Sequence, residues 1–444
     1  MEYWSPRLEV RMSRIVFVGA GNVEPTRRIL SDLFLSDPLH GDLDIVLHDD
    51  DPARLATAEA LARALNAEAG AGARVVGHTD RRRALDGADH VVASIEVGGF
   101  EATLRDFQIP HRYGLRQTIG DTIGIGGIFR GLRTIPAAVE LGLELTELCP
   151  DAWLLSHTDP MAMTGWAMHE ATGFTRFAGV CHAVCDTHVY LADLVRRDLD
   201  ELTLRSAGVN HQSFVLVFAD AEGRSLYPDL DAALAADAEL KSHVRVEMYR
   251  RFGFFPTESS EHAAEYVPWI MRHAAETSRL GVPVEEYLRR AGMSLHVYEE
   301  TRRALAAGRP LLIRWQHQEP AAAALLAMLT GQEKLVHVNV RNGGLIGNLP
   351  EEACVEVPAL VDAAGIRPQR VGELPIQLAA LNRTFLNVVE LTVRAVLDGD
   401  RRHVLHAAML DPNTAATLPL PAIEALCEEL LAAHGDLLPE AVRG

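Results

Sequence analysis

The stretch RIVFVGAG at residues 14–21 decides the predicted fold. Its first five residues, 14–18, form a short apolar, β-rich run that is typical of a buried strand, and Gly19 and Gly21 allow a tight turn directly after it. Apolar residues then recur at helical spacing over residues 25–35. A strand, a glycine turn and a helix in this order predict the first unit of a parallel sheet with helices on its faces.

The same alternation continues through the first half of the chain. After about residue 200 the pattern changes, because long helical stretches dominate and the apolar run at 209–218 could form one strand. Further strands are predicted at 43–47, 73–77, 90–95 and 153–157, and later helices at about 239–251, 260–275, 299–307, 316–330 and 372–398. We therefore predict an α/β protein with a doubly wound parallel sheet in an N-terminal domain (12–205) and a mixed α+β domain (206–444).

Composition narrows the class of partner. The 444 residues include 42 Lys and Arg against 61 Asp and Glu, a net charge of −19. Such an acidic balance argues against nucleic acid, whose phosphates need a basic face, and against an anionic membrane surface. No apolar run reaches the ~18 residues of a membrane span. A small-molecule partner is favoured by elimination.

Cysteine usage and the N-terminal segment indicate the compartment. The five cysteines are few, odd in number and scattered, which is typical of a reducing environment. Residues 1–13 carry charges and no apolar run, so we expect no signal peptide. A cytoplasmic location is the expectation.

The glycine turn is a candidate dinucleotide site. Gly19 and Gly21 would let a pyrophosphate approach backbone amides at a helix N-terminus, although Glu24 stands where a third glycine is usual. Asp49 ends the second predicted strand, where a carboxylate could bind the ribose hydroxyls and favour NAD over NADP. Arg54 lies nearby in the sequence, so NADP stays open as an alternative cofactor. A plain tight turn beside a solvated acidic loop would use the same residues.

A cysteine and a histidine are candidate metal ligands. Cys181 and His211 each follow a Gly-Val pair or lie just beyond one, which suggests two loops at strand ends. One thiolate and one imidazole could bind a divalent transition metal and leave positions open for substrate oxygens. The alternative is a buried thiol and a hydrogen-bonded core histidine.

A third candidate segment is FGFFPTESSEHAAEYVPW at residues 252–269. His262 and Tyr266 lie here among carboxylates, an arrangement that can tune a general base. The alternative is a helix start capped by Ser259 or Ser260.

Taken together, these segments resemble glycoside hydrolase family 4, the NAD- and manganese-dependent glycosidases, and lie nearest its α-galactosidase and α-galacturonidase branch. The resemblance covers about residues 13–431. Its matching blocks are GAGNV (19–23), VGG (97–99), IGDTIGIGGIFRGLRTIP (119–136), ELCPDAWLLSHTDPMAM (147–163), GVCHAV (179–184), GVNHQSF (208–214), TESSEHAAEYVPW (257–269), GGLIGNLP (343–350) and LAALNRTFLNVVEL (378–391).

This resemblance implies a Rossmann-like fold of the lactate and malate dehydrogenase type, in which residues 12–205 bind NAD and residues 206–444 supply substrate, metal and oligomer contacts. It implies hydrolysis of α-linked, non-phosphorylated galactosides or galacturonides by a redox route. NAD would oxidise C3, Mn²⁺ would acidify the C2 hydrogen, a base would remove it, the C1 group would leave, and water and the hydride would then add back. A homodimer or homotetramer is expected on the same ground.

The resemblance also assigns roles to individual residues. The C2 base would be His262 or Tyr266, with His262 preferred, and His182 would be the leaving-group acid. Gly19, Gly21, Asn22 and Asp49 would bind the dinucleotide, Cys181 and His211 the metal, and Arg130, Asp121, Asp159, Asn210 and Asn348 the sugar.

Some positions depart from the family pattern. Ser156 and Asp159 replace two asparagines, Glu96 replaces Gln or Arg, and Cys185 replaces Gln. Added acids at Glu96 and Asp159 should repel a uronate or phosphate. Two alternatives stay open: an NAD-dependent sugar dehydrogenase or epimerase on the same site, and a catalytically degenerate NAD-binding protein.

Overall fold

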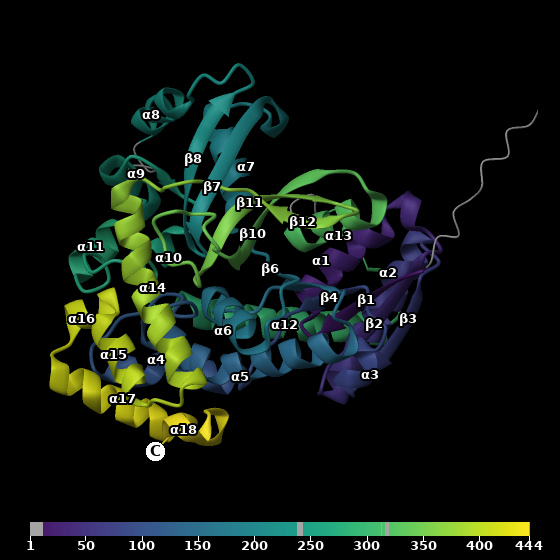
Figure 1. Ribbon diagram of the computed structural model, residues 1–444, viewed down its shortest axis with the longest axis horizontal. Coiled ribbons are helices and arrows are strands. Elements are labelled where there is room, and N and C mark those ends of the chain that lie inside the picture. Colours follow the sequence, from purple (N-terminus) through teal and green to yellow (C-terminus); the bar gives the residue numbers. More distant parts are fainter. Residues whose placement is uncertain (1–11, 238–242, 312, 316–318, 444) are drawn as a thin grey trace, which may run out of the picture.

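The computed structural model describes residues 12–237, 243–311, 313–315 and 319–443. Within these residues one sheet of twelve strands crosses the molecule in the order β3-β2-β1-β4-β5-β6-β10-β11-β7-β8-β9, with β12 paired to β11 (Figure 1). The first six strands are parallel. They are β1 (Ser13–Val18), β2 (Leu43–His48), β3 (Arg74–His78), β4 (His90–Ala93), β5 (Trp153–Ser156) and β6 (Phe177–Gly179).

The strand order 3-2-1-4-5-6 confirms the predicted doubly wound fold. β1 and β4 are neighbours, but the chain leaves them in opposite directions along the sheet, which makes this pair the topological switch point. The turn after β1 and the loop after β4 therefore diverge at the carboxyl ends of the strands. A crevice at this place is where ligands bind in open α/β sheets.

The second half of the chain extends the sheet with antiparallel strands. Asn339 on β10 lies opposite Gly179 on β6, so the sheet continues across residue 205, and the domain boundary there stays a prediction. The apolar run at 209–218 contains a strand as predicted, since most of it forms β8, but a turn at Asn210 and His211 separates this strand from β7. These strands are β7 (Leu202–Val209), β8 (Gln212–Asp220), β9 (Phe255–Pro256), β10 (Lys334–Arg341), β11 (Cys354–Asp362) and β12 (Gly365–Pro368).

Helices connect and cover the strands. In Figure 1, α5 runs along the lower side of the molecule, while α14 crosses toward the C-terminal helices α15 to α18. The helices near the site are α1 (Val23–Phe34), α2 (Pro52–Ala69), α4 (Gly99–Arg112), α5 (Gly124–Leu148), α6 (Met161–Thr172), α7 (Ala183–Val195), α10 (Ser260–Glu265), α12 (Glu286–Ala306), α13 (Pro320–Thr330) and α14 (Ile376–Leu397). The others are α3 (Arg81–Leu85), α8 (Tyr227–Ala236), α9 (Val244–Phe252), α11 (Ala274–Arg279), α15 (Arg402–Leu410), α16 (Pro412–Thr417), α17 (Leu420–His434) and α18 (Glu440–Arg443).

The helix expected over residues 260–275 is shorter than predicted. It ends at Glu265, and α11 begins only at Ala274. Pro268 explains the break, because proline has no amide hydrogen to donate and disfavours helical geometry at the residue before it. The predicted helices at 239–251 and 316–330 each begin in residues outside the described ranges.

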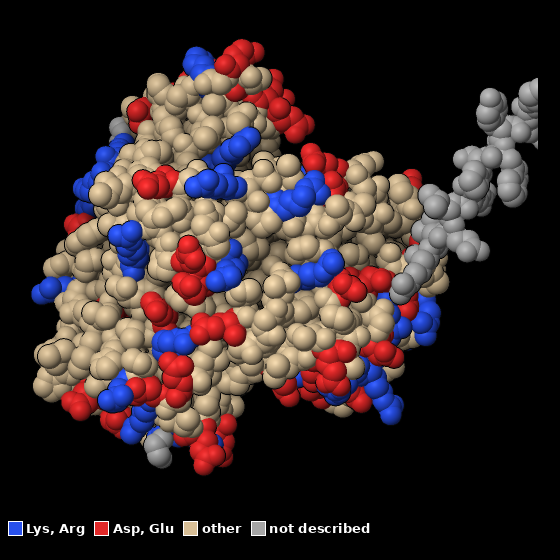
Figure 2. Space-filling model, in the orientation of Figure 1, with Lys and Arg blue, Asp and Glu red and all other residues tan. Residues whose placement is uncertain are grey.

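Two surface observations bear on partners. On the face shown in Figure 2, the described Lys and Arg side chains are interspersed with Asp and Glu and do not form one basic patch. Among the described residues, no helix combines the length and the apolar composition that crossing a bilayer requires.

Candidate active site

A cavity of about 270 Å³ opens at the switch point between β1 and β4. A second hollow adjoins it and extends to Asp49 at the end of β2, because both share Asn22, Arg54 and Ser94. The two together form one crevice along the carboxyl edge of the parallel strands. The polar and aromatic side chains that line the first cavity are Asn22, Glu24, Arg54, Ser94, Glu96, Phe100, Arg130, His157, Asp159, Tyr287, Ser294 and Tyr298.

The glycine turn lies at one end of this crevice. Gly19 has a φ of +80°, and a Cβ atom there would come within 2.3 Å of the Ser94 carbonyl oxygen. The Gly21 amide donates to Asp49 Oδ2 at 2.8 Å, and the Asp51 amide donates to Asp49 Oδ1 at 3.1 Å. Burial raises the pKa of Asp49, and these two amide hydrogen bonds partly oppose the rise. Asp49 therefore braces the turn in addition to lining the hollow.

The start of α1 faces the cavity without a side-chain cap. Asn22 occupies the capping position, but its Nδ2 atom donates to Ser94 Oγ at 3.0 Å instead. The first amide groups of a helix have no partner inside the helix and carry its positive dipole end. This end can hold the phosphates of a dinucleotide.

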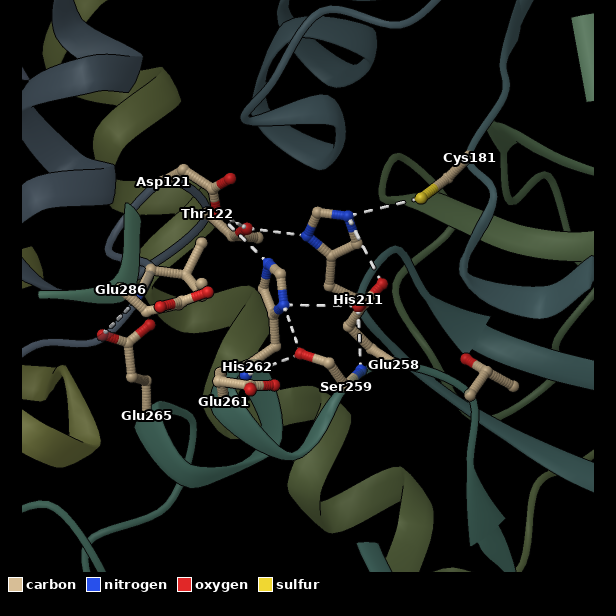
Figure 3. A network of polar contacts seen from close by, with 12 residues as sticks. Asp121, Thr122, Cys181, His211, Glu258, Ser259, Glu261, His262, Glu265 and Glu286 are labelled. Carbon is tan, nitrogen blue, oxygen red and sulfur yellow. Dashed lines mark hydrogen bonds and ion pairs between the residues drawn. The ribbon is translucent and has the colours of Figure 1, made fainter. Parts of the chain in front are cut away.

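Cys181 and His211 point toward one another (Figure 3), and His211 interacts electrostatically with Asp159 of the cavity wall. Cys181 follows β6 and His211 lies in the β7–β8 turn, and the distance from Cys181 Sγ to His211 Nε2 is 3.4 Å. Glu258 Oε2 lies 3.9 Å from the same nitrogen. Sulfur, nitrogen and oxygen donor atoms of these three residues all lie within 4.8 Å of one another. Burial raises the pKa of the Cys181 thiol to about 11.

The orientation of the His211 ring is set by its second nitrogen. Thr122 Oγ1 lies 2.7 Å from His211 Nδ1 and donates its own hydrogen to Asp121 Oδ1 at 2.6 Å. Because a hydroxyl has one hydrogen, Thr122 must accept from Nδ1–H, so the neutral form of the His211 ring has its lone pair on Nε2, toward Cys181. His211 also has a φ of +66°, a conformation that is uncommon outside glycine and marks functional sites.

His262 and Tyr266 lie beside this cluster. The His262 and His211 rings are 4.5 Å apart, and His262 Nε2 lies 3.5 Å from Asp121 Oδ1. Ser259 caps α10, as one of the sequence alternatives expected, and its hydroxyl also contacts His262 Nδ1 at 3.1 Å. Tyr266 is buried against Phe385, with its ring 6.0 Å from that of His262. His262 thus contacts both Asp121 and His211.

Glu265 holds the loop that carries Asp121. Its carboxylate accepts hydrogen bonds from the amides of Thr118, Ile119 and Gly120, the last two at 3.1 and 2.9 Å. Burial raises the pKa of Glu265 to about 7, although these amide bonds oppose the rise. Helix α10 and the loop at residues 118–121 are thereby fixed to each other.

The predicted sugar contacts divide into two groups. Arg130 and Asp159 line the cavity, and the Arg130 guanidinium donates to Tyr287 Oη at 2.7 Å. The Asn210 amide is fully buried without a hydrogen bond. Asn348 is different, because Nδ2 donates to the Leu374 carbonyl and Oδ1 accepts from the Leu374 amide. The structure does not bring Asn348 to the cavity.

Several residues at the site were not among the predicted ones. Glu258 offers a third donor atom next to Cys181 and His211, and its spacing of four residues from His262 was the available signal, although α10 itself begins only at Ser260. Thr122 directly follows the predicted Asp121. Tyr287 and Glu319 reach the site from distant segments, and no local pattern in the sequence indicates them.

Comparisons with known proteins agree with this geometry. Residues 14–197 match the model described as family 4 glycosyl hydrolase, and residues 206–414 match that of its C-terminal domain. The chain is 39% identical to an alpha-galactosidase of Bacillus subtilis over 97% of its length and 100% of the relative. It is 32% identical to an alpha-galactosidase of Rhizobium meliloti, over 96% and 89% of the two chains.

A solved structure has the same fold. It is a 6-phospho-alpha-glucosidase from gut microorganisms in complex with NAD and Mn²⁺, with a TM-score of 0.82, 20% identity, and coverage of 97% of this chain and 100% of that one. The fold and the site together define a glycoside hydrolase built on a dinucleotide-binding sheet. The chain belongs to glycosyl hydrolase family 4.

Proposed function

We propose that this enzyme hydrolyses neutral α-linked galactosides with NAD and Mn²⁺ as resident cofactors. The observation that carries the proposal is the meeting of Cys181, His211 and Glu258, because His211 interacts with Asp159, which lines the same cavity as the glycine turn. Redox-assisted cleavage needs a dinucleotide and a metal next to the same sugar. The 39% identical alpha-galactosidase supports the choice of sugar.

The crevice suits a dinucleotide. The uncapped start of α1 would hold the phosphates, Gly21 and Asn22 would lie beneath them, and the hollow at Asp49 would receive the adenosine. Asp49 uses one lone pair on each oxygen for a backbone amide, so each oxygen can still accept a ribose hydroxyl.

The donor set suits a transition metal. A thiolate, an imidazole and a carboxylate would hold Mn²⁺ and leave positions for two sugar oxygens. A cation at this point would also lower the pKa of the Cys181 thiol, which burial raises, and so favour the thiolate. When bound, NAD supplies a reversible hydride acceptor for C3, and the metal polarises the neighbouring carbonyl and so acidifies the C2 hydrogen.

The protein's own side chains would handle protons and orientation. His262 would remove the C2 hydrogen, since it lies against His211 and is held by Ser259 and Asp121. Tyr266 is the second candidate for this base. His182 would donate a proton to the leaving group, and Arg130, Asp121, Asp159 and Asn210 would bind sugar hydroxyls.

The charges of the cavity favour a neutral sugar. Among the described lining residues, Arg130 is held by Tyr287 and Arg54 by the Gly21 carbonyl and the Tyr298 ring. Glu96 and Asp159 add negative charge to the same space. The positive charge of Arg130 is already offset by Glu96, Asp159 and Asp121, so Arg130 offers little net attraction to a uronate or phosphate.

The test is a comparison of 4-nitrophenyl α-galactoside, α-glucoside and α-galacturonide with NAD, Mn²⁺ and reductant present. We expect release of nitrophenol from the α-galactoside without NADH accumulation, and exchange of the C2 hydrogen in deuterated water. Stoichiometric NADH formation would support a sugar dehydrogenase instead. Binding of NAD without exchange for any of the hexosides would support a degenerate binding protein.

A further inference from the structure

Glu319 is a buried carboxylate that none of the roles above uses. It caps helix α13, where Oε1 accepts from the Ala321 amide at 3.3 Å, and its side chain is fully shielded from solvent. The start of a helix stabilises a negative charge. A buried carboxylate in this position is costly unless it has further partners.

Those partners are two histidines from different loops. His182 Nε2 lies 2.6 Å from Glu319 Oε2, and His157 Nε2 lies 3.5 Å from Glu319 Oε1. The two rings stack with centroids 5.9 Å apart. His157 follows β5 and lines the cavity, whereas His182 follows β6 directly after Cys181. Glu319 thus contacts both His157 in the cavity wall and His182, the residue after Cys181.

The contact with Glu319 decides which nitrogen of His182 is available. A carboxylate accepts hydrogen bonds, so Nε2 carries the hydrogen of this contact and is occupied by Glu319. Nδ1 has no hydrogen-bond partner among the described residues and is left for proton exchange. The side chain of His182 is about one-third exposed, which a proton donor to an entering substrate requires.

We propose that Glu319 is a positioning residue that fixes the ring of His182 so that Nδ1 faces the leaving group. This inference rests on the proposed function, because it takes His182 as the leaving-group acid. In the step, the Nδ1–H bond breaks as its proton moves to the glycosidic oxygen, and the electron pair of the C1–O bond goes to that oxygen. His182 then recovers a proton from water.

The kinetic test uses leaving groups of different quality. Cleavage of methyl α-galactoside requires protonation of its poor leaving group. Cleavage of 4-nitrophenyl α-galactoside requires little, because nitrophenolate is a good leaving group. We expect E319D, which keeps a capping carboxylate but is one methylene shorter, to lose on the order of 10²-fold in kcat/KM on the methyl glycoside. On the nitrophenyl glycoside the loss should be about fivefold or less. H182Q should show the same selectivity, and the double variant should be no slower than H182Q alone.

A second measurement does not depend on activity. Nitrogen-15 NMR of histidine-labelled protein, assigned with H182Q, should show a hydrogen-bonded Nε2–H of His182 in the wild type and loss of that signal through exchange with water in E319D. E319Q keeps an acceptor oxygen at full reach and should retain most of the signal, and E319A replaces E319D if that variant does not fold. Equal losses on both glycosides, or additive effects in the double variant, would overturn the proposal. An inert wild type with the expected Nε2–H signal would overturn the proposed function alone.

Discussion

The Sγ atom of Cys181 and the Nε2 atom of His211 lie 3.4 Å apart, although the residues are 30 positions apart in the chain. The sheet register explains this approach. Gly179 on β6, Asn339 on β10, Glu356 on β11 and Gly208 on β7 form one row of paired residues across four strands. Cys181 and His211 follow the two ends of that row by two and three residues.

The first prediction concerns the sulfur. Cys181→Ser should weaken Mn²⁺ binding by on the order of 10²-fold or more, because a hydroxyl is a poorer transition-metal ligand than a thiolate. Metal-dependent turnover should disappear and NAD affinity should stay within about twofold. Calorimetry with Mn²⁺ and NAD separately measures both. Cys185→Ser, on the next turn of α7, is the matched control and should keep Mn²⁺ binding; full activity of Cys181→Ser without added Mn²⁺ would contradict the assignment.

The second prediction concerns the hydroxyl behind His211. Thr122→Val keeps the side-chain shape but removes the acceptor for His211 Nδ1–H and the donor to Asp121. We expect a 10- to 100-fold loss of Mn²⁺ affinity, the usual effect of removing a residue that orients a metal-binding histidine. Thr122→Ser should restore affinity to near the wild-type value. Equal affinity in the valine and serine variants would show that the hydroxyl does not set the His211 tautomer.

Local patterns were sufficient to predict five of the six parallel strands, and β6, with three residues, was not predicted. The strands from β1 to β5 each begin or end within about two residues of the predicted apolar runs, because a buried parallel strand must be apolar throughout. In the β7–β8 hairpin only β8 was predicted, as a strand within 209–218, and the turn before it was missed because Asn210 and His211 interrupt the run without glycine or proline. The turn depends on a positive φ at His211, which residue type alone does not indicate.

The site was predicted less completely than the fold. Cys181 and His211 carry a recognisable pattern, but their meeting depends on the register of four strands. Glu319 and Tyr287 come from helices more than 100 residues away, and only tertiary packing brings them to His182 and Arg130. Asn348 was predicted as a sugar contact because its block resembles the family, yet the Leu374 backbone uses both of its polar atoms.

The third prediction concerns the charge of the sugar. Glu96→Gln and Asp159→Asn each remove a negative charge from the cavity wall. Each should raise the ratio of kcat/KM for α-galacturonide over α-galactoside by about tenfold, since a like charge nearby costs on the order of 1 kcal/mol. Glu24→Gln is the control, because Glu24 lines the same cavity but pairs with Arg28 at the glycine-turn end. An unchanged ratio in both cavity variants would mean that these acids do not select the substrate.

The fourth prediction concerns the pH dependence of stability and the buried cap of α16. Asp411 is fully buried and accepts from the Thr414 amide at 2.8 Å. Burial raises the pKa of Asp411 to about 6 from an unfolded value of about 4. The folded state therefore holds the proton more tightly, so this group's contribution to stability is present below pH 4 and is lost as pH rises through 6.

Asp411→Asn tests that sign, because asparagine also caps helices but carries no charge. At ~1.4 kcal/mol per pKa unit, the variant should gain up to about 3 kcal/mol in unfolding free energy relative to wild type between pH 4 and pH 7. Urea unfolding of both proteins at several pH values in that range measures the difference. Asp411→Ala removes the cap as well and should be less stable than Asp411→Asn throughout the range. A difference between wild type and Asp411→Asn that does not grow with pH would show that the carboxyl does not titrate near pH 6.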